Sequence, residues 1–163
     1  MTIPMIWHGF EEAAPELAEL GRQRFEATHV ALLGTLRRDG SARISPIEPN
    51  LVLGHLLLGM LAGSNKARDV SRDPRCTIHS AVSDVNGSEG EFKLHGRALV
   101  VTDPALLHGG YEAWWTADDA SPSRVFSFDI ESAAHIAWDL ERGEMTVRRW
   151  SPGSGVEMSV RAY

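Results

Sequence analysis

The stretch "VALLGTLRRDGSARISPI" (residues 30–47) carries the strongest β-hairpin signal in the chain. A short apolar run, partly β-branched, is followed by a polar segment with Asp39 and Gly40, and a second run begins directly after it. An Asp-Gly pair between two such runs is typical of a hairpin turn, because both residues tolerate the positive φ angles of tight turns. The stretch therefore predicts strands over 29–36 and 42–47.

Further segments have the apolar content or the alternating pattern of β-strands. The segment that begins at Glu91, for example, alternates Phe92, Leu94 and Ala98 with mostly polar residues, so that one face of the strand is apolar. Turn-forming residues separate the segments, as at Gly143. The expected strands cover residues 55–63, 76–82, 91–101, 124–130, 133–140 and 146–151.

Other segments have the features of helices. Leu17, Leu20 and Phe25 recur at roughly helical spacing among charged residues and good helix formers. Asp103 and Pro104 are the residue types that favour the N-cap and the first position of a helix. A polar segment that ends before a proline has the composition of a short helix. The helices are expected over residues 11–27, near 64–72 and near 104–116.

This succession of short strands and a few helices predicts a mainly β (α+β) fold. Antiparallel barrels and sandwiches with helices at their ends have this combination of elements. The length of 163 residues corresponds to one domain over 1–163, and 43% hydrophobic residues are enough for a sizeable core.

Composition and charge exclude several classes of protein. Acidic residues outnumber basic ones by 22 to 16, which gives a net charge of -6, and no basic block or stripe follows the sequence. Nucleic acid is therefore not an expected partner. Cys76 is the single cysteine, so no internal disulfide is expected.

Neither a membrane nor a metal ion is an expected partner. The longest apolar run, residues 51–63, is interrupted by His55 and is too short to cross a bilayer. The N-terminus lacks the charged and apolar regions of a signal peptide, which favours a cytoplasmic location. The seven histidines are scattered, and Cys76 and His79 would point to opposite faces of one strand.

Lys66 stands at the start of the short helix expected near 64–72. The backbone dipole already places positive charge at a helix start, so a lysine there is locally unfavourable unless an anion lies between the two. The free amide groups of a first helical turn are natural donors to phosphate. Lys66 is therefore either part of a phosphate site or a solvated lysine that tolerates a cost of about 0.3–1 kcal/mol.

The order of these elements resembles the pyridoxamine 5'-phosphate oxidase-like family of FMN-binding split β-barrels. The resemblance rests on residues 30–47, on "LLLGMLAGSNKARDVSRDPRCTIHS" (56–80) and on "GEFKLHGRALVV" (90–101), and "MTVRRWSPG" (145–153) is similar to the last barrel strand. It implies an antiparallel, Greek-key-like split β-barrel over 29–150 with flanking helices. It also implies a homodimer with two equivalent cofactor sites at the subunit interface.

The same resemblance implies a site for FMN. The turn from Ser64 to Lys66 matches the segment that holds the cofactor phosphate, and Arg43 matches an arginine that approaches the phosphate or the ribityl chain. The alternative for Arg43 is an outward-facing barrel residue, and Trp138 could instead fill the core. Met60 stands where many relatives carry a hydroxyl donor, which a methionine cannot replace. The implied cofactor-binding residues are Arg43, Ser45, Ile47, Met60, Leu61, Ser64, Asn65, Lys66 and Trp138.

The resemblance implies an oxidoreductase in which the flavin carries the redox chemistry and hydride passes between its ring and a small conjugated substrate. No catalytic side chain is required. A related branch binds a deazaflavin coenzyme with an anionic oligoglutamate tail, for which Arg37 and Arg38 could supply a basic groove. The alternative of another class is a non-enzymatic small-molecule or haem-binding barrel or sensor, with His55 or His79 as an iron ligand. Oxidation of pyridoxamine phosphate itself is not expected, because no Arg-x-His motif accompanies "RRWSP".

Overall fold

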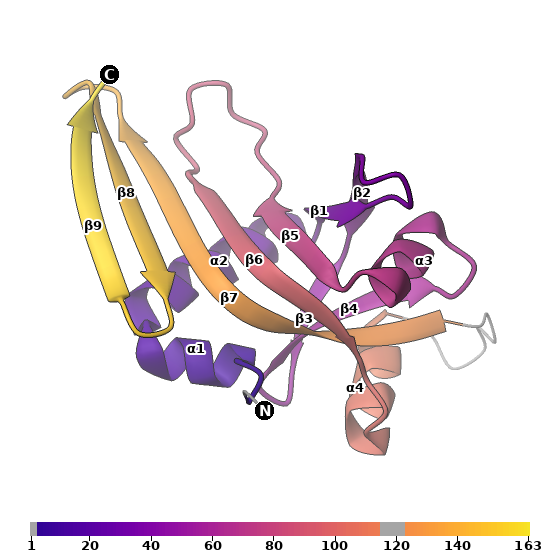
Figure 1. The fold of residues 1–163 in the computed structure, drawn as a ribbon. Coiled ribbons are helices and arrows are strands. Elements are labelled where there is room, and N and C mark those ends of the chain that lie inside the picture. The colour runs from indigo at the N-terminus through magenta and orange to yellow at the C-terminus, as the bar shows by residue number, and fades with distance from the viewer. Residues whose placement is uncertain (1–2, 115–122) are drawn as a thin grey trace.

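The computed structural model describes residues 3–114 and 123–163, in which the strands form one sheet with helices packed around it (Figure 1). The strands are β1 (Ala31–Leu36), β2 (Ala42–Ile47), β3 (Pro49–Val52), β4 (His55–Leu61), β5 (Arg75–Ser80), β6 (Glu91–Val100), β7 (Ser123–Asp139), β8 (Glu144–Ser151) and β9 (Gly155–Ala162). The helices are α1 (Trp7–Ala13), α2 (Pro15–Thr28), α3 (Asn65–Arg72) and α4 (Pro104–Trp114). The expected mainly β fold with flanking helices is confirmed.

All neighbouring strands of the sheet are antiparallel. The strand order is β2-β1-β5-β6-β7-β4-β3, and β8 and β9 extend from β7. The expected hairpin is present: β1 pairs with β2, and Gly40 has a φ of 83° in the turn between them. This hairpin and α3 lie at the end of the molecule opposite to β9 (Figure 1).

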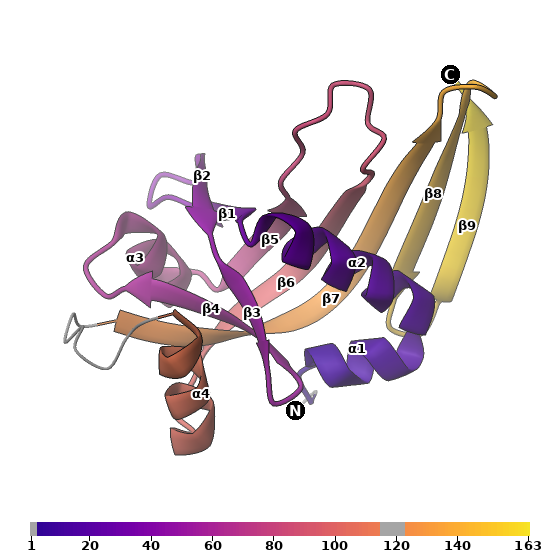
Figure 2. The same ribbon diagram turned by 180° about the vertical axis from the view of Figure 1, so that it is seen from behind.

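The core lies between the sheet and the helices α1 and α2, which cross the sheet in Figure 2. Trp7 and Phe10 of α1 are buried and meet edge to face, with ring centroids 5.5 Å apart. Phe25 of α2 packs in the same way on Phe92 of β6, at 5.6 Å. Trp7 also contacts Phe92, at 6.4 Å, so the ring of Phe92 joins both helices to the sheet, and such pairs stabilise a core beyond the area that they bury.

The single helix expected over 11–27 is two helices in the structure. The break falls at Ala14, whose φ of -147° and ψ of 63° are not helical, and Pro15 begins α2. Proline has no N–H to donate and its ring clashes with the carbonyl four residues earlier, so it starts a helix but does not continue one. The apolar spacing alone could not show this break.

The strands expected over 124–130 and 133–140 are one 17-residue strand, β7. A bulge in its pairing with β6, between His95 and Gly96, leaves Glu131 as an extra residue and allows the strand to bend without ending. Gly96 is required there, because a Cβ atom added to it would lie 1.9 Å from the carbonyl oxygen of Asp129.

Two strands were not expected from the sequence. β3 pairs with β4 through a turn in which Leu53 and Gly54 both have positive φ angles, of 48° and 78°. β9 follows β8 after a turn with positive φ at Gly153 and Gly155, so the sheet continues beyond the expected end at residue 150. The helix near 104–116 is present to Trp114, and residues 115 and 116 lie outside the described part.

His135 is a buried histidine on β7. It is 5% exposed, and its Nδ1 has no hydrogen-bond partner among the described residues. The backbone of Gly90 lies against the ring, since a Cβ atom there would be 2.9 Å from Nε2. Burial, and then the charges of Arg148 and Arg24, lower the pKa of His135 from 6.5 to about 4. Folded His135 is therefore neutral at neutral pH.

This pKa predicts a loss of stability in mild acid. Between pH 6.5 and about 4 the unfolded chain binds a proton that folded His135 does not, so stability is complete above pH 6.5 and falls as the pH falls toward 4. The fall should reach about 2 kcal/mol at pH 5. We expect urea unfolding to show it between pH 7 and 5, and His135→Gln to flatten the curve. Parallel curves for the two proteins would assign the acid sensitivity to another group.

Candidate functional site

Two hollows adjoin at the first turn of α3. One, the arginine pocket, has a volume of about 730 Å³, and the other, the Lys66 pocket, has a volume of about 720 Å³. Asn65 lines the first, and its chain neighbours Ser64 and Lys66 line the second. The arginine pocket is lined by Arg37, Arg38, Asp39, Arg43, Asn65, Arg68, Asp69 and Arg72. The Lys66 pocket is lined by Val30, Pro46, Ile47, Glu48, Gly59, Met60, Leu61, Ser64, Lys66 and Trp114.

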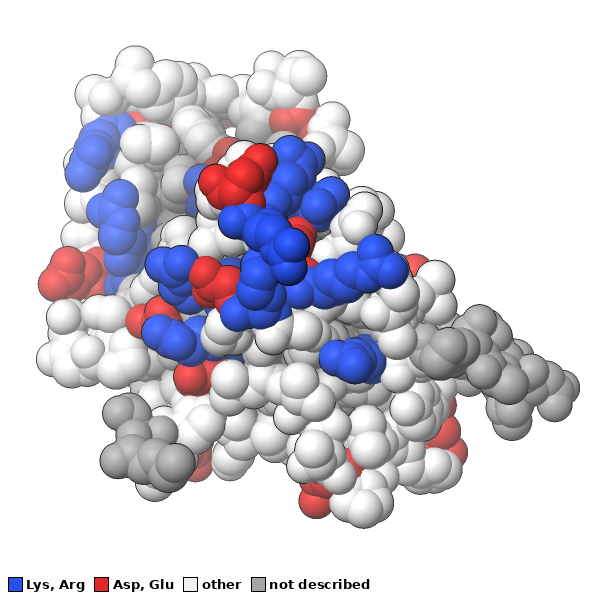
Figure 3. All heavy atoms as spheres, turned by 45° about the vertical axis from the view of Figure 1, so that its right-hand side comes forward, with Lys and Arg blue, Asp and Glu red and all other residues white. Residues whose placement is uncertain are grey.

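The arginine pocket is strongly cationic. Its five arginines come from the β1–β2 turn, from β2 and from α3, and they face two aspartates. Figure 3 shows basic side chains gathered on the side of the molecule that carries these elements. Five positive charges against two negative ones leave an excess of three, in a chain whose net charge is -6. Such a concentration favours an anionic ligand.

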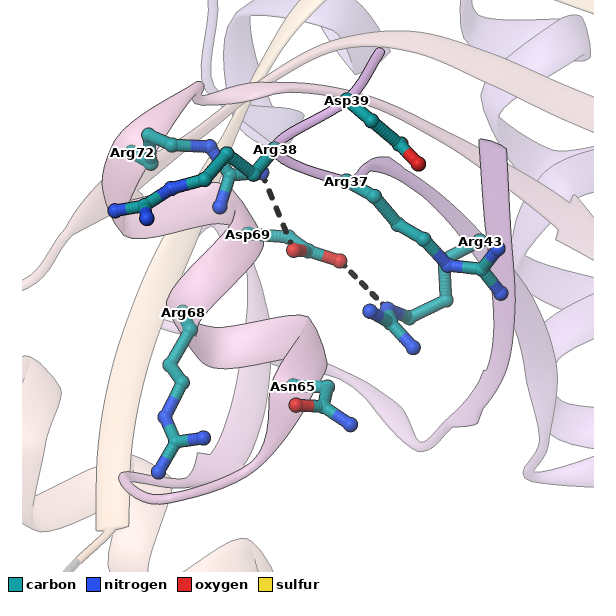
Figure 4. Close-up of a pocket in the computed structure, with 8 residues that line it drawn as sticks. All are labelled: Arg37, Arg38, Asp39, Arg43, Asn65, Arg68, Asp69 and Arg72. Atoms are coloured by element: carbon teal, nitrogen blue, oxygen red, sulfur yellow. Dashed lines mark hydrogen bonds and ion pairs between the residues drawn. The ribbon is translucent and has the colours of Figure 1, made fainter. Parts of the chain in front are cut away.

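Asp69 organises the arginines of this pocket. The residue is 4% exposed, and its carboxylate accepts a hydrogen bond from Thr35 Oγ1 at 3.0 Å. It also accepts from Arg43 Nε at 2.7 Å and from Arg72 at 3.2 Å (Figure 4). Burial alone would raise the pKa of Asp69, but the bonds from Arg43, Thr35 and Arg72 outweigh burial and hold the pKa below 3.8. The bond from Arg43 uses Nε, which leaves the two terminal nitrogens of that guanidinium directed into the pocket.

Removing the charge of Asp69 is expected to destabilise the fold. Asp69→Asn leaves the guanidinium groups of Arg43 and Arg72 without their buried counter-ion, at a cost of about 2 kcal/mol in the free energy of unfolding. Glu131→Gln is the matched control, because Glu131 pairs with Arg97 on the exposed surface and such pairs contribute about 0–1 kcal/mol. Equal urea midpoints for the two variants would contradict this role of Asp69.

The Lys66 pocket has an apolar floor and one cation. Met60 and Ile47 are buried at its base, and Trp114 of α4 forms a wall in which Nε1 donates to the carbonyl oxygen of Glu48 at 2.9 Å. Lys66 Nζ donates to the carbonyl oxygen of Pro46 at 2.6 Å. Desolvation lowers the pKa of Lys66, against the opposing charge of Glu48. A partly desolvated ammonium gains more from an anionic partner than one in free solvent.

The start of α3 has the donors that a phosphate requires. Ser64 is the N-cap of the helix, and its Oγ accepts a hydrogen bond from the amide of Ala67 at 3.3 Å. The amides of the first turn have no carbonyl partner within the helix, and no acidic residue lies in that turn. Arg43 on one side and Lys66 on the other flank these amides. The junction of the two pockets can therefore hold a dianion.

Most of the residues implied by the sequence meet at this place. Arg43 and Asn65 line the arginine pocket, and the Lys66 pocket holds five others: Ile47, Met60, Leu61, Ser64 and Lys66. Ser45 lies between Arg43 and Ile47 on β2 but lines neither pocket. The structure does not bring Trp138 to this site. Trp138 packs over Gly87, where an added Cβ atom would be 2.8 Å from the indole ring.

The sequence reasoning missed Arg68, Asp69 and Arg72 as parts of the site. The spacing of Asn65, Arg68, Asp69 and Arg72 was a usable signal, since residues three and four apart share one face of a helix.

His55 and His79, the two histidines considered as iron ligands, each engage Nδ1 and lie outside the two pockets. His55 Nδ1 lies 2.8 Å from Ser127 Oγ, and His79 Nδ1 lies 2.7 Å from the carbonyl oxygen of Ser80. Neither histidine lines the arginine pocket or the Lys66 pocket, and burial lowers the pKa of His55. No group of three or more potential metal ligands occurs in residues 3–114 and 123–163. Of the helices in these ranges, none has the length and hydropathy needed to span a bilayer.

One family of known sequences matches most of the chain. The sequence model of the family described as Pyridoxamine 5'-phosphate oxidase matches residues 17–137. Among curated proteins, none matches the chain with significance.

Several solved structures share the fold. PhzG from Burkholderia lata 383, in complex with tetrahydrophenazine-1-carboxylic acid, has a TM-score of 0.65 at 9% identity, over 100% of this chain and 98% of that chain. A pyridoxamine 5'-phosphate oxidase-related, FMN binding protein from Nostoc punctiforme has a TM-score of 0.60 at 10% identity, over 91% and 96%. A heme binding protein from Mycobacterium smegmatis has a TM-score of 0.58 at 16% identity, over 86% and 56%. At these low identities the three structures show a shared fold and no more, and that fold is the split β-barrel.

Proposed function

The chain belongs to the pyridoxamine 5'-phosphate oxidase-like family, and on that premise we propose that it binds FMN at the junction of the two pockets and acts as an oxidoreductase. The observation that carries this proposal is the convergence of Arg43, Lys66 and the first turn of α3. Family members bind FMN, as the structure from Nostoc punctiforme shows for one of them.

The phosphate is assigned to the first turn of α3. The amides of residues 65 and 66 donate along the helix axis, while the amide of Ala67 keeps its bond to Ser64, and the guanidinium of Arg43 and the ammonium of Lys66 donate from either side. Each of these bonds is charge-assisted and shorter and stronger than a bond between neutral groups. The phosphate also removes the unfavourable approach of Lys66 to the positive end of the helix dipole.

The ring is assigned to the Lys66 pocket. Ile47 and Met60 offer a buried apolar floor, and the indole of Trp114 offers an aromatic wall. Met60 cannot donate a hydrogen bond to the ring, and Pro46 has no N–H. The amide of Arg37 donates to Ser41, so in the continuous β1–β2 register the amides of Ser45 and Ile47 point toward β1 and are not free for the ring. FMN supplies the hydride chemistry, and the protein supplies position and electrostatics for a small conjugated substrate.

A second copy of the chain is proposed to cover this side of the molecule. Exposed apolar side chains lie on and beside the pockets, with Leu61 54% and Ile44 72% exposed. Val30 at the edge of the Lys66 pocket is also exposed. Burial of these side chains by a homodimer would remove apolar surface from water and enclose the ring.

A deazaflavin coenzyme is the second candidate cofactor, and the arginine pocket favours it. Arg37, Arg38, Arg68 and Arg72 add four cations to Arg43, which exceeds the need of one phosphate. An oligoglutamate tail is a polyanion that such a pocket would attract. The ring and the phosphate would use the same junction as FMN.

Titration of the cofactor-free protein tests the assignment. We expect FMN to bind at least about tenfold more tightly than riboflavin, because only FMN carries the phosphate for Arg43 and Lys66. Equal affinities for FMN and riboflavin would contradict a phosphate site at Arg43 and Lys66. Tighter binding of the deazaflavin than of FMN, with a strong dependence on salt, would select the second candidate. If no flavin binds, the chain is a non-enzymatic barrel and the redox proposal fails.

A further inference from the structure

β9 is an edge strand without the usual protection of an edge. In the described residues it pairs with β8 on one side and has no strand on the other. It runs for eight residues, "GVEMSVRA", and contains no proline, no lysine and no register shift in its pairing with β8. Prolines, lysines and bulges usually protect the edge strands of natural sheets, because the free N–H and C=O groups of an edge can pair with another chain.

The orientation of the free groups follows from one hydrogen bond. The amide of Tyr163 donates to the carbonyl oxygen of Gly143 at 3.2 Å, so the backbone groups of residue 163 point toward β8. Direction alternates along an antiparallel strand, and the register with β8 is continuous from Gly155 to Ala162. The groups of the even-numbered residues, Val156, Met158, Val160 and Ala162, therefore point to the open edge.

The side chains of β9 are of two kinds. Val156, Met158 and Val160 form an apolar row on one face, and they are 49%, 64% and 54% exposed. The opposite face carries Glu157, Ser159 and Arg161. In the described residues neither Glu157 nor Arg161 belongs to an ion pair of the chain.

We propose that β9 pairs antiparallel with β9 of a second copy, about a two-fold axis at Ser159. In this register Glu157 of each copy faces Arg161 of the other, Met158 faces Val160 and Val156 faces Ala162. Two opposite-charge pairs and a continuous apolar row form at once, and cross-strand pairs of both kinds stabilise a sheet. A neighbouring symmetric register loses this match: an axis at Glu157 places two carboxylates together, and an axis at Met158 places Glu157 against Ser159.

The hydrogen-bond pattern permits the same register. With the axis at Ser159, even-numbered residues face even-numbered ones, so the free N–H and C=O groups of both strands meet. The odd-numbered residues occupy the non-hydrogen-bonded positions, where opposite side chains come closest. Glu157 and Arg161 therefore meet in the closer of the two kinds of pair.

This interface is separate from the cofactor site. β9 lies at the end of the molecule opposite to α3 and β2 (Figure 1). One paired edge of eight residues buries less than the roughly 1,200–2,000 Å² of a stable interface, so the association is weak on its own and adds to any dimer at the pockets. It does not depend on the proposed function.

Cysteine trapping tests the axis. Ser159→Cys places two thiols across a non-hydrogen-bonded pair, where Cα atoms are about 4.5 Å apart and a disulfide can form. We expect a covalent dimer on mild oxidation. Ser154→Cys is the matched control, since two copies of residue 154 would be roughly 33 Å apart along the paired strands. Cys76 is buried with its pKa raised to about 12, so it stays inert. Equal cross-linking of the two variants, or none in Ser159→Cys, would overturn the proposal.

Charge reversal tests the register in the Ser159→Cys background. Arg161→Glu places two carboxylates in each close pair and should reduce the yield of covalent dimer several-fold. Adding Glu157→Arg restores the opposite charges in the reverse order and should restore the yield. Yields that do not change with either reversal would contradict the register. FMN titration of the same variants should match the wild type, which separates a failure here from a failure of the proposed function.

Discussion

Replacing Lys66 with alanine is expected to weaken FMN binding about 10- to 150-fold, because a hydrogen bond to a charged group contributes about 1.5–3 kcal/mol. Lys66 lines the pocket beside the first turn of α3, where its ammonium is partly desolvated. Arg43 approaches the same junction from β2. The double replacement of Lys66 and Arg43 should therefore weaken binding more than either single one. Quenching of flavin fluorescence during titration measures each affinity.

Lys93 provides the control for this prediction, since it is the other lysine of the chain. It lies on β6 and pairs with Glu91 at 2.7 Å, and it lines neither pocket. Lys93→Ala should leave FMN affinity unchanged. Riboflavin, which has no phosphate, should bind wild type and Lys66→Ala almost equally. If Lys66→Ala and Lys93→Ala bind FMN alike, the phosphate is held elsewhere.

The parts of the fold that the sequence predicted well are those with local signals. The turn at Asp39 and Gly40 needs only the conformational freedom of its own residues, and the hairpin around it was confirmed. The helix near 64–72 was also found, because an N-cap serine and a following proline mark its two ends. The break before Pro15 was a local signal too, but the continuous apolar spacing concealed it.

The parts of the fold that the sequence did not predict depend on contacts between residues far apart in the chain. β7 continues through a bulge that exists only in its pairing with β6, so the sequence around Glu131 does not by itself predict the bulge. The turn before β4 requires a positive φ at Leu53, an uncommon conformation for leucine that the pairing of β3 with β4 accommodates.

The candidate site divides in the same way. Lys66 could be named from its place at the start of a helix, and Arg43 from the family resemblance alone. The cationic character of the arginine pocket could not, because it arises when the β1–β2 turn and one face of α3 come together over Asp69. Asp69 bonds Thr35 of β1 and Arg43 of β2 simultaneously, so one buried carboxylate determines where both strands present their side chains. The contact of Asp69 with both strands cannot be predicted from the local sequence around any one of these residues.

Gly96→Ala is expected to be the most damaging single substitution considered for this fold. A Cβ atom at residue 96 would lie 1.9 Å from the carbonyl oxygen of Asp129, well inside contact distance, and 3.0 Å from the ring of Phe128. Backbone cannot give way as a flexible side chain does, so β6 and β7 must separate at the bulge that curves the sheet. We expect a loss of about 3–5 kcal/mol in the free energy of unfolding, measured in urea.

Gly34→Ala is the matched control, because it makes the same change on β1 of the same sheet. A Cβ atom there would meet the carbonyl oxygen and Cβ of Thr77 at 3.7 and 3.8 Å, which are ordinary contacts. Its free energy of unfolding should stay within about 1 kcal/mol of the wild type. Alanine lowers the conformational entropy of the unfolded chain, and this gain offsets the small cost of fitting the methyl group. If Gly96→Ala proves too unstable to purify while Gly34→Ala folds normally, the close approach at the bulge is supported. If the two variants unfold at the same urea concentration, β7 does not approach β6 as closely as the structure places it, and the bend would need another cause.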